Sequence, residues 1–331
     1  MIRRRDFITL LGAAAAGWPV AARAQQESVR RVGVLLSAAA TEVEYQGYLA
    51  AFVQEMRRLG WSEGQNLRLD VRWNAGDAAL SRVYAKQMIE LTPDVIVAGS
   101  TVNLAALQQA TNTIPIVFVQ VADPLTQGFV SNMRQPGGNI TGFSLFEFSL
   151  AGKWLSLLKE IAPAVKRVAV MFDPGTLPYF KFFVPVFDAA AKSLDVEVVS
   201  LPVLSESEIE PLLTGFARQP NGGLLVPGGS FTRLHLKEIA ALAGRYQLPS
   251  IASIGLAVAG GLIDYGPSFD LPRHYAQAAT YVDRILRGTK PGELPVQPPT
   301  NYKFVLNLKT AKALGLTVPN GLVLAADQVI E

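Results

Sequence analysis

Short apolar runs alternate with helix-like segments along most of this chain, and this alternation constrains the fold more than any other feature. Val95–Ala98 is the clearest example, an apolar run that predicts a buried strand and that Gly99 ends. Ser100 and Thr101 come next, and either hydroxyl can cap the Ala-rich helix predicted over Leu104–Ala110. Such a strand–turn–helix unit places its loop at the carboxyl edge of a sheet, where open α/β folds bind ligands.

The same unit recurs in two rounds. The first round, residues 31–144, predicts the order β-α-β-α-β-α-β, and the second covers residues 151–254. Each round predicts a parallel sheet with helices on both faces, so the expected fold class is α/β with two doubly wound lobes. The elements after residue 257 are too few to bury a core alone and should complete the two sheets. The predicted strands cover residues 31–36, 66–73, 95–98, 116–121, 140–144, 167–172, 196–201, 223–226, 249–254, 261–265 and 304–306.

Residues 1–24 have the pattern of an export signal rather than of folded structure. Arg3–Arg5 form a charged start, Phe7–Val20 is apolar but too short to span a membrane, and Ala22–Ala24 predicts cleavage before Gln25. Arg4–Ile8 resembles the twin-arginine signal, and an ordinary secretory signal is the alternative. Both signals export the mature chain, so we expect a bacterial periplasmic protein without a membrane span.

The charge balance and the absence of cysteine exclude several classes of function. The whole chain has a net charge of +3, but four basic residues and one acidic residue lie within 1–24, which leaves 26 basic and 26 acidic residues. A neutral chain lacks the basic surface that nucleic-acid binding requires. Without Cys there can be no disulfide, no thiolate metal site and no cysteine nucleophile.

Two α/β lobes with interleaved connections in an exported, uncharged chain describe a periplasmic binding protein, in which the exit loops of both sheets face one cleft. A more specific resemblance is carried by the segments Arg31–Leu35, Thr92–Val97, Val121–Pro124, Gly138–Ser144, Gly260–Gly266 and Asn307–Gly315. Through them, residues 30–330 resemble the ABC-transporter substrate-binding family whose better-known members bind tryptophan or tyrosine. That family belongs to the type I periplasmic binding proteins.

The resemblance implies a three-crossing hinge and a role in transport. The crossings are expected near residues 143–147, 251–256 and 295–302. Lobe I would then comprise residues 29–143 plus 257–294, and lobe II residues 148–250 plus 303–331. The implied function is that of a monomeric periplasmic receptor that needs no cofactor and delivers a small molecule to an ABC permease in the inner membrane.

One departure from the family concerns the ligand. Amino-acid binders of the family carry an Asp after the Val-Pro of the second-lobe strand, whereas this chain has Gly228-Gly229-Ser230 after Val226-Pro227. The carboxylate that would pair with a ligand ammonium is therefore missing. The expected ligand is a small organic acid, aromatic or amino, held in the cleft between the lobes.

The candidate ligand contacts of the first lobe lie on its strand exits. Ser100 and Thr101 match the family's anion contact and suit a carboxylate, with helix capping as the alternative role. Asp123 can accept from a ligand hydroxyl or ammonium, or can cap the helix that the following proline starts. Tyr45 can stack on a planar ligand or pack within its own helix. Ser37 lies at the exit of the first strand.

The candidates of the second lobe lie on two exit loops, and they are Asp173, Thr176, Tyr179, Gly229 and Ser230. Asp173 precedes a proline and can equally start a turn. Gly229 and Ser230 offer N–H and hydroxyl donors at a predicted helix start. Tyr265, assigned to lobe I, is expected to point into the cleft near the hinge, with a buried core position as the alternative.

No catalytic or metal-binding pattern accompanies these residues. His235 and His274 are the only histidines, and no His/Asp/Glu cluster shows metal spacing, so both are interpreted as helix-face residues. The chain has no G-x-S-x-G, no P-loop and no G-x-G-x-x-G after a strand, so a binding protein is favoured over an enzyme. A sensory binding protein that docks on a membrane sensor would have the same lobes and is the alternative.

Overall fold

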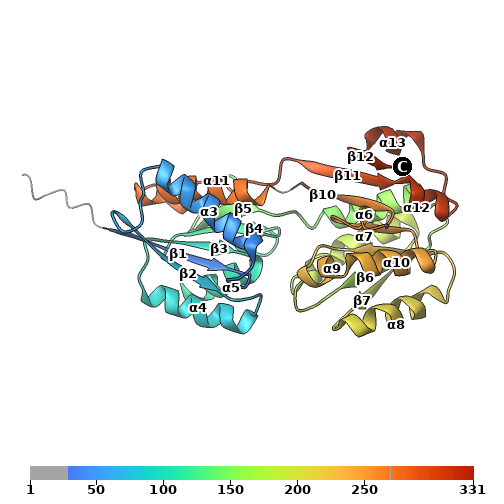
Figure 1. Ribbon diagram of the computed structural model, residues 1–331, viewed down its shortest axis with the longest axis horizontal. Coiled ribbons are helices and arrows are strands. Elements are labelled where there is room, and N and C mark those ends of the chain that lie inside the picture. The colour runs from blue at the N-terminus through green and yellow to red at the C-terminus, as the bar shows by residue number, and fades with distance from the viewer. Residues whose placement is uncertain (1–28, 269) are drawn as a thin grey trace, which may run out of the picture.

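Two α/β lobes joined by three chain crossings make up the protein (Figure 1). The computed structural model describes residues 29–268 and 270–331, and the side chain of Ser230 lies outside this description. The expected export signal and its cleavage before Gln25 also lie outside the described residues. Among the described residues, none of the helices has the length and apolar character needed to span a bilayer. The fold class predicted from the sequence is confirmed.

The first lobe contains a five-stranded, fully parallel sheet in the order β2-β1-β3-β4-β5. Its strands are β1 (Arg30–Leu36), β2 (Leu67–Trp73), β3 (Val95–Gly99), β4 (Ile116–Val121) and β5 (Ile140–Ser144). Its helices are α3 (Val43–Arg58), α4 (Ala78–Glu90), α5 (Thr101–Ala110) and α11 (Leu271–Leu286), and the short 3-10 helix η2 (Pro291–Glu293) follows them.

Packing on both faces of this sheet explains why its central strands are continuous apolar runs. Successive side chains of a strand point to opposite faces. In β3, Val95 and Val97 belong to the hydrophobic cluster beneath α3 and α11, whereas Ile96 and Ala98 belong to the cluster beneath α4 and α5. A run without polar positions is therefore what a strand with two buried faces requires.

The second lobe contains a seven-stranded sheet in the order β12-β11-β10-β9-β8-β6-β7, in which β10 and β11 are antiparallel. Its strands are β6 (Arg167–Phe172), β7 (Glu197–Pro202), β8 (Gly222–Val226), β9 (Ser250–Ala252), β10 (Ile263–Pro267), β11 (Tyr302–Asn307) and β12 (Gln328–Ile330). Its helices are α6 (Leu150–Ile161), η1 (Phe180–Phe182), α7 (Val184–Leu194), α8 (Glu206–Ala217), α9 (Ser230–Leu234), α10 (Leu236–Arg245), α12 (Leu308–Ala313) and α13 (Asn320–Ala325).

The position of the second crossing corrects the division drawn from the sequence. β10 pairs with β9 and with β11, so residues 257–267 belong to the second lobe and not to the first. The chain crosses after Pro267, before α11 begins at Leu271, rather than at 251–256. The buried carboxylate of Asp264 accepts the N–H groups of Leu256 and Ala257, at 2.8 and 3.1 Å. These bonds tie the loop after β9 to β10. The sequence could not show this, because an apolar run indicates a buried strand but not which of two sheets the strand will join.

The other two crossings run side by side. Residues 145–149 lead from β5 to α6, and residues 294–301 lead from η2 to β11. The N–H of Ser144 donates to the carbonyl of Gln297 at 2.8 Å, and the N–H of Gln297 donates to the carbonyl of Gly142 at 2.9 Å. Backbone pairing thus couples two of the three connections between the lobes.

Candidate ligand-binding site

The carboxyl edges of the two sheets face the same space between the lobes. β5 leaves the first sheet at its carboxyl end to cross to the second lobe, and β10 leaves the second sheet at its carboxyl end to cross back. Because parallel strands share their direction, all five strands of the first sheet and strands β6 to β10 of the second end toward the crossings, whereas β11 and β12 run the opposite way. The strand exits, with the helices that follow them, are therefore the candidate site.

Three tyrosines from two helices form the aromatic part of this site, and we call Tyr45, Tyr48 and Tyr275 the tyrosine cluster. The ring centroids of Tyr45 and Tyr48 are 5.1 Å apart, and those of Tyr48 and Tyr275 are stacked at 5.5 Å. Burial raises the pKa of each of the three hydroxyls, so all of them stay protonated and can donate hydrogen bonds. Tyr45 is the half-buried member and was predicted from the sequence, whereas the other two were missed.

Gln120 connects the tyrosine cluster to the exit of β4. It accepts the hydroxyl of Tyr275 at 3.3 Å, and a hydrogen bond between Gln120 and Tyr45 partly offsets the pKa rise of Tyr45. Its backbone φ is +61°, a left-handed conformation that costs a non-glycine residue on the order of 1 kcal/mol. Such strain concentrates at functional sites. Nothing in the sequence could have indicated it, because any residue type can be forced into this conformation by its surroundings.

The exit of β3 lies against the same cluster. An added Cβ on Gly99 would lie 2.7 Å from the Tyr275 hydroxyl, so only glycine lets the strand approach this closely. Ser100 caps α5 by accepting the N–H of Asn103 at 3.1 Å, which leaves its hydroxyl proton free to donate to a ligand. Ser37, at the exit of the neighbouring strand β1, is half-buried.

The hydroxyl of Thr101 and the carboxylate of Asp123 are engaged within the protein. Thr101 Oγ1 accepts the N–H of Ala122 at 3.1 Å and so joins the exits of β3 and β4. The two oxygens of Asp123 accept the N–H groups of Thr126 and Phe148, at 3.0 and 3.1 Å. The sequence analysis left helix capping open for Asp123, and in the structure its carboxylate holds the first crossing in place.

The second-lobe loops offer small and polar groups. Asp173 Oδ1 accepts the N–H of Thr176 at 2.6 Å, which closes the turn after β6. An added Cβ on Gly229 would lie 3.2 Å from Thr176 Oγ1, so the exits of β6 and β8 are adjacent. Ser230 is the first residue of α9 and lies at the same edge.

Tyr179 and Tyr265 do not join the tyrosine cluster. The ring of Tyr179 packs against Phe146 and Phe148, at 6.4 and 5.9 Å, beneath the first crossing. Tyr265 lies on β10 in the second lobe rather than in the first, and its ring stacks on Tyr302 at 6.0 Å. The expectation that Tyr265 belongs to lobe I is therefore wrong, for the strand-pairing reason given above.

Arg233 is a functional candidate that the sequence analysis missed. It lies on α9, and its Nη1 is 3.8 Å from Oε2 of Glu44 at the start of α3, so this ion pair spans the two lobes. Glu44 also accepts the hydroxyl of Tyr48. Both charged side chains are about half exposed, at 56% and 55%. A cation thus stands opposite the tyrosine cluster, on the helix that follows the loop where the sequence lacks the expected Asp.

The sequence profile described as "ABC transporter substrate binding protein" matches residues 31–330. The chain belongs to this family. The resemblance inferred from the sequence is therefore confirmed, and the family is one of substrate-binding proteins. The tyrosine-binding protein of Clostridioides difficile (strain R20291) is 26% identical over 266 residues, which cover 80% of this chain and 75% of that relative.

Two solved structures of similar proteins have the same fold. A conserved domain protein of Vibrio cholerae has a TM-score of 0.74 and 26% identity, covering 91% of this chain and 100% of that one. An ABC domain of Streptococcus pneumoniae, solved in complex with L-Trp, has a TM-score of 0.73 and 24% identity, covering 92% and 100%. This substrate-binding protein therefore has the type I periplasmic fold.

Proposed function

We propose that this substrate-binding protein is the exported receptor of an ABC importer and that its lobes close on a small aromatic carboxylic acid. One observation carries the proposal. The tyrosine cluster, which includes the half-buried Tyr45, contacts the strand exit that leads into α5, and Arg233 of the second lobe pairs with Glu44 beside this cluster. Aromatic walls and carboxylate partners therefore face each other from opposite lobes.

The carboxylate would be bound by groups of both lobes. The start of α5 presents backbone N–H groups and the positive end of a helix dipole, and the Ser100 hydroxyl adds a donor. Arg233 can supply a charge-assisted, bidentate hydrogen bond from the other side. Its present partner is exposed, and such a surface ion pair is worth only about 0–1 kcal/mol. A ligand carboxylate can therefore replace Glu44 as the partner of Arg233 when the lobes close.

The aromatic ring of the ligand would pack against Tyr45, the half-buried member of the tyrosine cluster. Offset or edge-to-face ring pairs contribute about 0.5–1.5 kcal/mol beyond the area they bury. The neutral hydroxyls of Tyr45 and Tyr275 share the side chain of Gln120, so the ring wall is held in one orientation before a ligand arrives. Preorganisation of this kind reduces the entropy lost on binding.

Two relatives suggest members of the ligand class. One is named for tyrosine and another was solved with L-Trp, both of them aromatic acids. At the position where the resemblance to amino-acid binders implies an Asp as the ammonium partner, this chain has Gly228 and Gly229. We therefore expect the carboxylate and the ring to determine affinity, and the α-amino group to add little.

Calorimetry with matched ligands tests this assignment. L-tyrosine, its deaminated analogue 3-(4-hydroxyphenyl)propionate and its decarboxylated analogue tyramine differ only in the groups under discussion. The two carboxylates should bind and tyramine should not. If tyramine or a sugar binds and no carboxylate does, the proposed ligand class is wrong.

Uptake measurements test the transport step separately. Cells that lack the gene should lose high-affinity uptake of the labelled acid, and a plasmid copy should restore it. Unchanged uptake together with a lost transcriptional response to the acid would instead favour a sensory role.

A further inference from the structure

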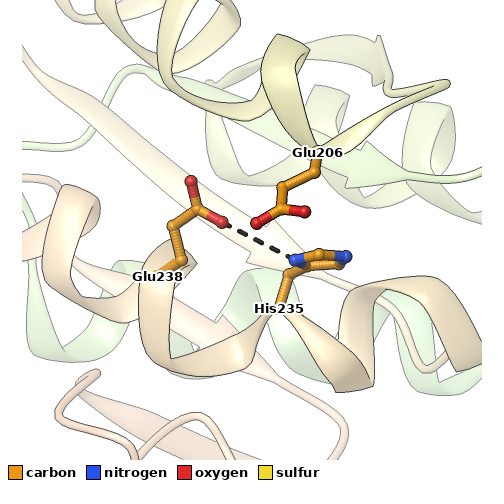
Figure 2. Close-up of side chains that lie close together, drawn as sticks. All are labelled: Glu206, His235 and Glu238. Carbon is orange, nitrogen blue, oxygen red and sulfur yellow. Dashed lines mark ion pairs between the residues drawn. The ribbon is translucent and has the colours of Figure 1, made fainter.

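Three potential metal ligands meet on the second lobe, although no metal site was predicted from the sequence. Glu206 is the first residue of α8, His235 joins α9 to α10, and Glu238 lies in the first turn of α10 (Figure 2). One ligand atom from each of the three side chains lies within 4.8 Å of the other two. In the close-up the three side chains point toward one another from two separate segments of the chain.

The spacing of these atoms suits a transition-metal ion. His235 Nδ1 lies 3.6 Å from Glu238 Oε2. Tetrahedral zinc, with bonds of about 2.0–2.2 Å to nitrogen and oxygen, places its ligand atoms about 3.4 Å from one another. The histidine and one glutamate are therefore already close to the required distance. Glu206 is exposed, so rotation of its side chain can bring an oxygen to the third position.

The backbone and a neighbouring ring hold the histidine in place. His235 and Glu238 are three residues apart at the start of one helix, which places them on the same face. The ring of Phe231 packs on the imidazole at 4.6 Å, and the His235 side chain is only 19% exposed. The histidine is thus partly preorganised, while Glu206 on the other segment is exposed.

The charges of the group suit a divalent cation. Two carboxylates approach one imidazole, and a cation between the carboxylates would offset the repulsion of their negative charges. In the described part of the chain, neither Glu206 nor Glu238 forms an ion pair with Lys or Arg. The nearby Arg245 is already paired with Glu210, at 2.8 Å. A divalent ion would neutralise the pair of carboxylates that the fold brings together.

We propose that Glu206, His235 and Glu238 bind one divalent transition-metal cation of the zinc class, with water completing its coordination. An imidazole nitrogen favours zinc, nickel or copper, whereas magnesium and calcium prefer oxygen ligands throughout. The site lies between α8 and α10, on residues other than those proposed to contact the organic ligand. It is a binding activity in addition to the proposed function and does not depend on it.

Calorimetric titration of the tag-free protein with ZnCl₂ at pH 7.5 tests the proposal. The wild type should bind one ion with a saturable heat, and His235→Gln and Glu206→Gln should each weaken zinc affinity at least tenfold. MgCl₂ should give no comparable binding. His274→Gln replaces the other histidine, and Glu210→Gln removes another carboxylate of α8, so these two matched controls should retain wild-type affinity.

Circular dichroism of each variant separates a lost ligand from a lost fold. Should His235→Gln fail to fold, the exposed Glu206→Gln variant decides alone. The proposal is overturned if the wild type shows no saturable zinc binding, if both site variants bind zinc as the wild type does, or if His274→Gln lowers affinity as much as they do.

Discussion

The two lobes share an architecture but present different chemistry to the space between them. The first lobe is a small, fully parallel unit whose exits carry buried aromatic rings and a strained residue, Gln120. The second lobe is larger, includes an antiparallel pair, and presents glycines and the exposed cation Arg233. We infer that the first lobe provides a rigid wall for the ligand, and that the second supplies an adjustable charge.

The largest expected effect is on the free energy of unfolding, and it comes from substitution of Gly142 in the first lobe. Gly142 on β5 has a φ of +152°, and an added Cβ would lie 2.1 Å from the carbonyl oxygen of Phe118. Gly142→Ala should therefore lower the free energy of unfolding by about 4 kcal/mol, because backbone atoms must move.

The matched control for this substitution is Gly47→Ala, in the middle of α3, where an added Cβ meets nothing within 4 Å. It should stabilise the protein by about 0.5–1 kcal/mol, because alanine favours the helix. Chemical denaturation of both variants measures the difference. Equal stability of the two variants would contradict a tightly constrained first lobe.

Arg233 tests the role assigned to the second lobe. Arg233→Gln should weaken binding of the aromatic acid about tenfold, which corresponds to about 1.4 kcal/mol, with little change in stability because the side chain is exposed. Arg245→Gln removes another exposed cation of the same lobe, and its affinity should stay within about twofold of the wild type. Calorimetry on the two variants distinguishes a specific contact from a general loss of positive charge. If both substitutions weaken binding equally, Arg233 has no direct role.

Replacing one tyrosine of each lobe by phenylalanine compares the contribution of the two hydroxyls to ligand binding. Tyr275→Phe deletes a partly buried hydrogen bond to Gln120 and should cost about 1 kcal/mol of stability. It should also weaken ligand binding a few-fold, because the ring wall loses its fixed orientation. Tyr179→Phe keeps the ring that packs against Phe146 and Phe148, so it should leave ligand affinity unchanged. A larger affinity loss in Tyr179→Phe would reverse the assignment of roles.

The smallest effect is a difference in pH dependence between the half-buried His274 and the buried Asp264. Burial lowers the pKa of His274 in the first lobe, so its neutral form contributes stability above pH 6.5 that is lost as the pH falls through the folded-state pKa. Burial raises the pKa of Asp264 in the second lobe, so stability falls as the pH rises from the unfolded-state pKa of 3.8 through the folded-state pKa.

Melting temperatures measured between pH 7.5 and 5.5 test the histidine. The wild type should lose more stability over this range than His274→Gln, by less than about 1 kcal/mol. The same acid sensitivity in both proteins would show that His274 is not responsible.

The sequence analysis predicted the recurring elements closely, because hydrophobic periodicity and helix caps are local. The strand expected over 95–98 is β3 (Val95–Gly99), and the strand expected over 167–172 is β6 (Arg167–Phe172). The cap predicted at Ser100 is present. Of the tyrosine cluster only Tyr45 was found, since Tyr275 reaches the site from a helix more than 200 residues away along the chain.

Local patterns in the amino-acid sequence were sufficient for the α/β class, two lobes and the family, because strand and helix preferences depend on neighbouring residues. Tertiary structure alone decided that residues 257–267 join the second sheet, that Gln120 adopts a left-handed backbone, and that Arg233 faces Glu44. It also brought Glu206 to His235 and Glu238. Each of these features depends on contacts between segments that are distant in the sequence. In such contacts, burial and backbone hydrogen bonding across the lobe outweigh the local conformational preference of a short segment.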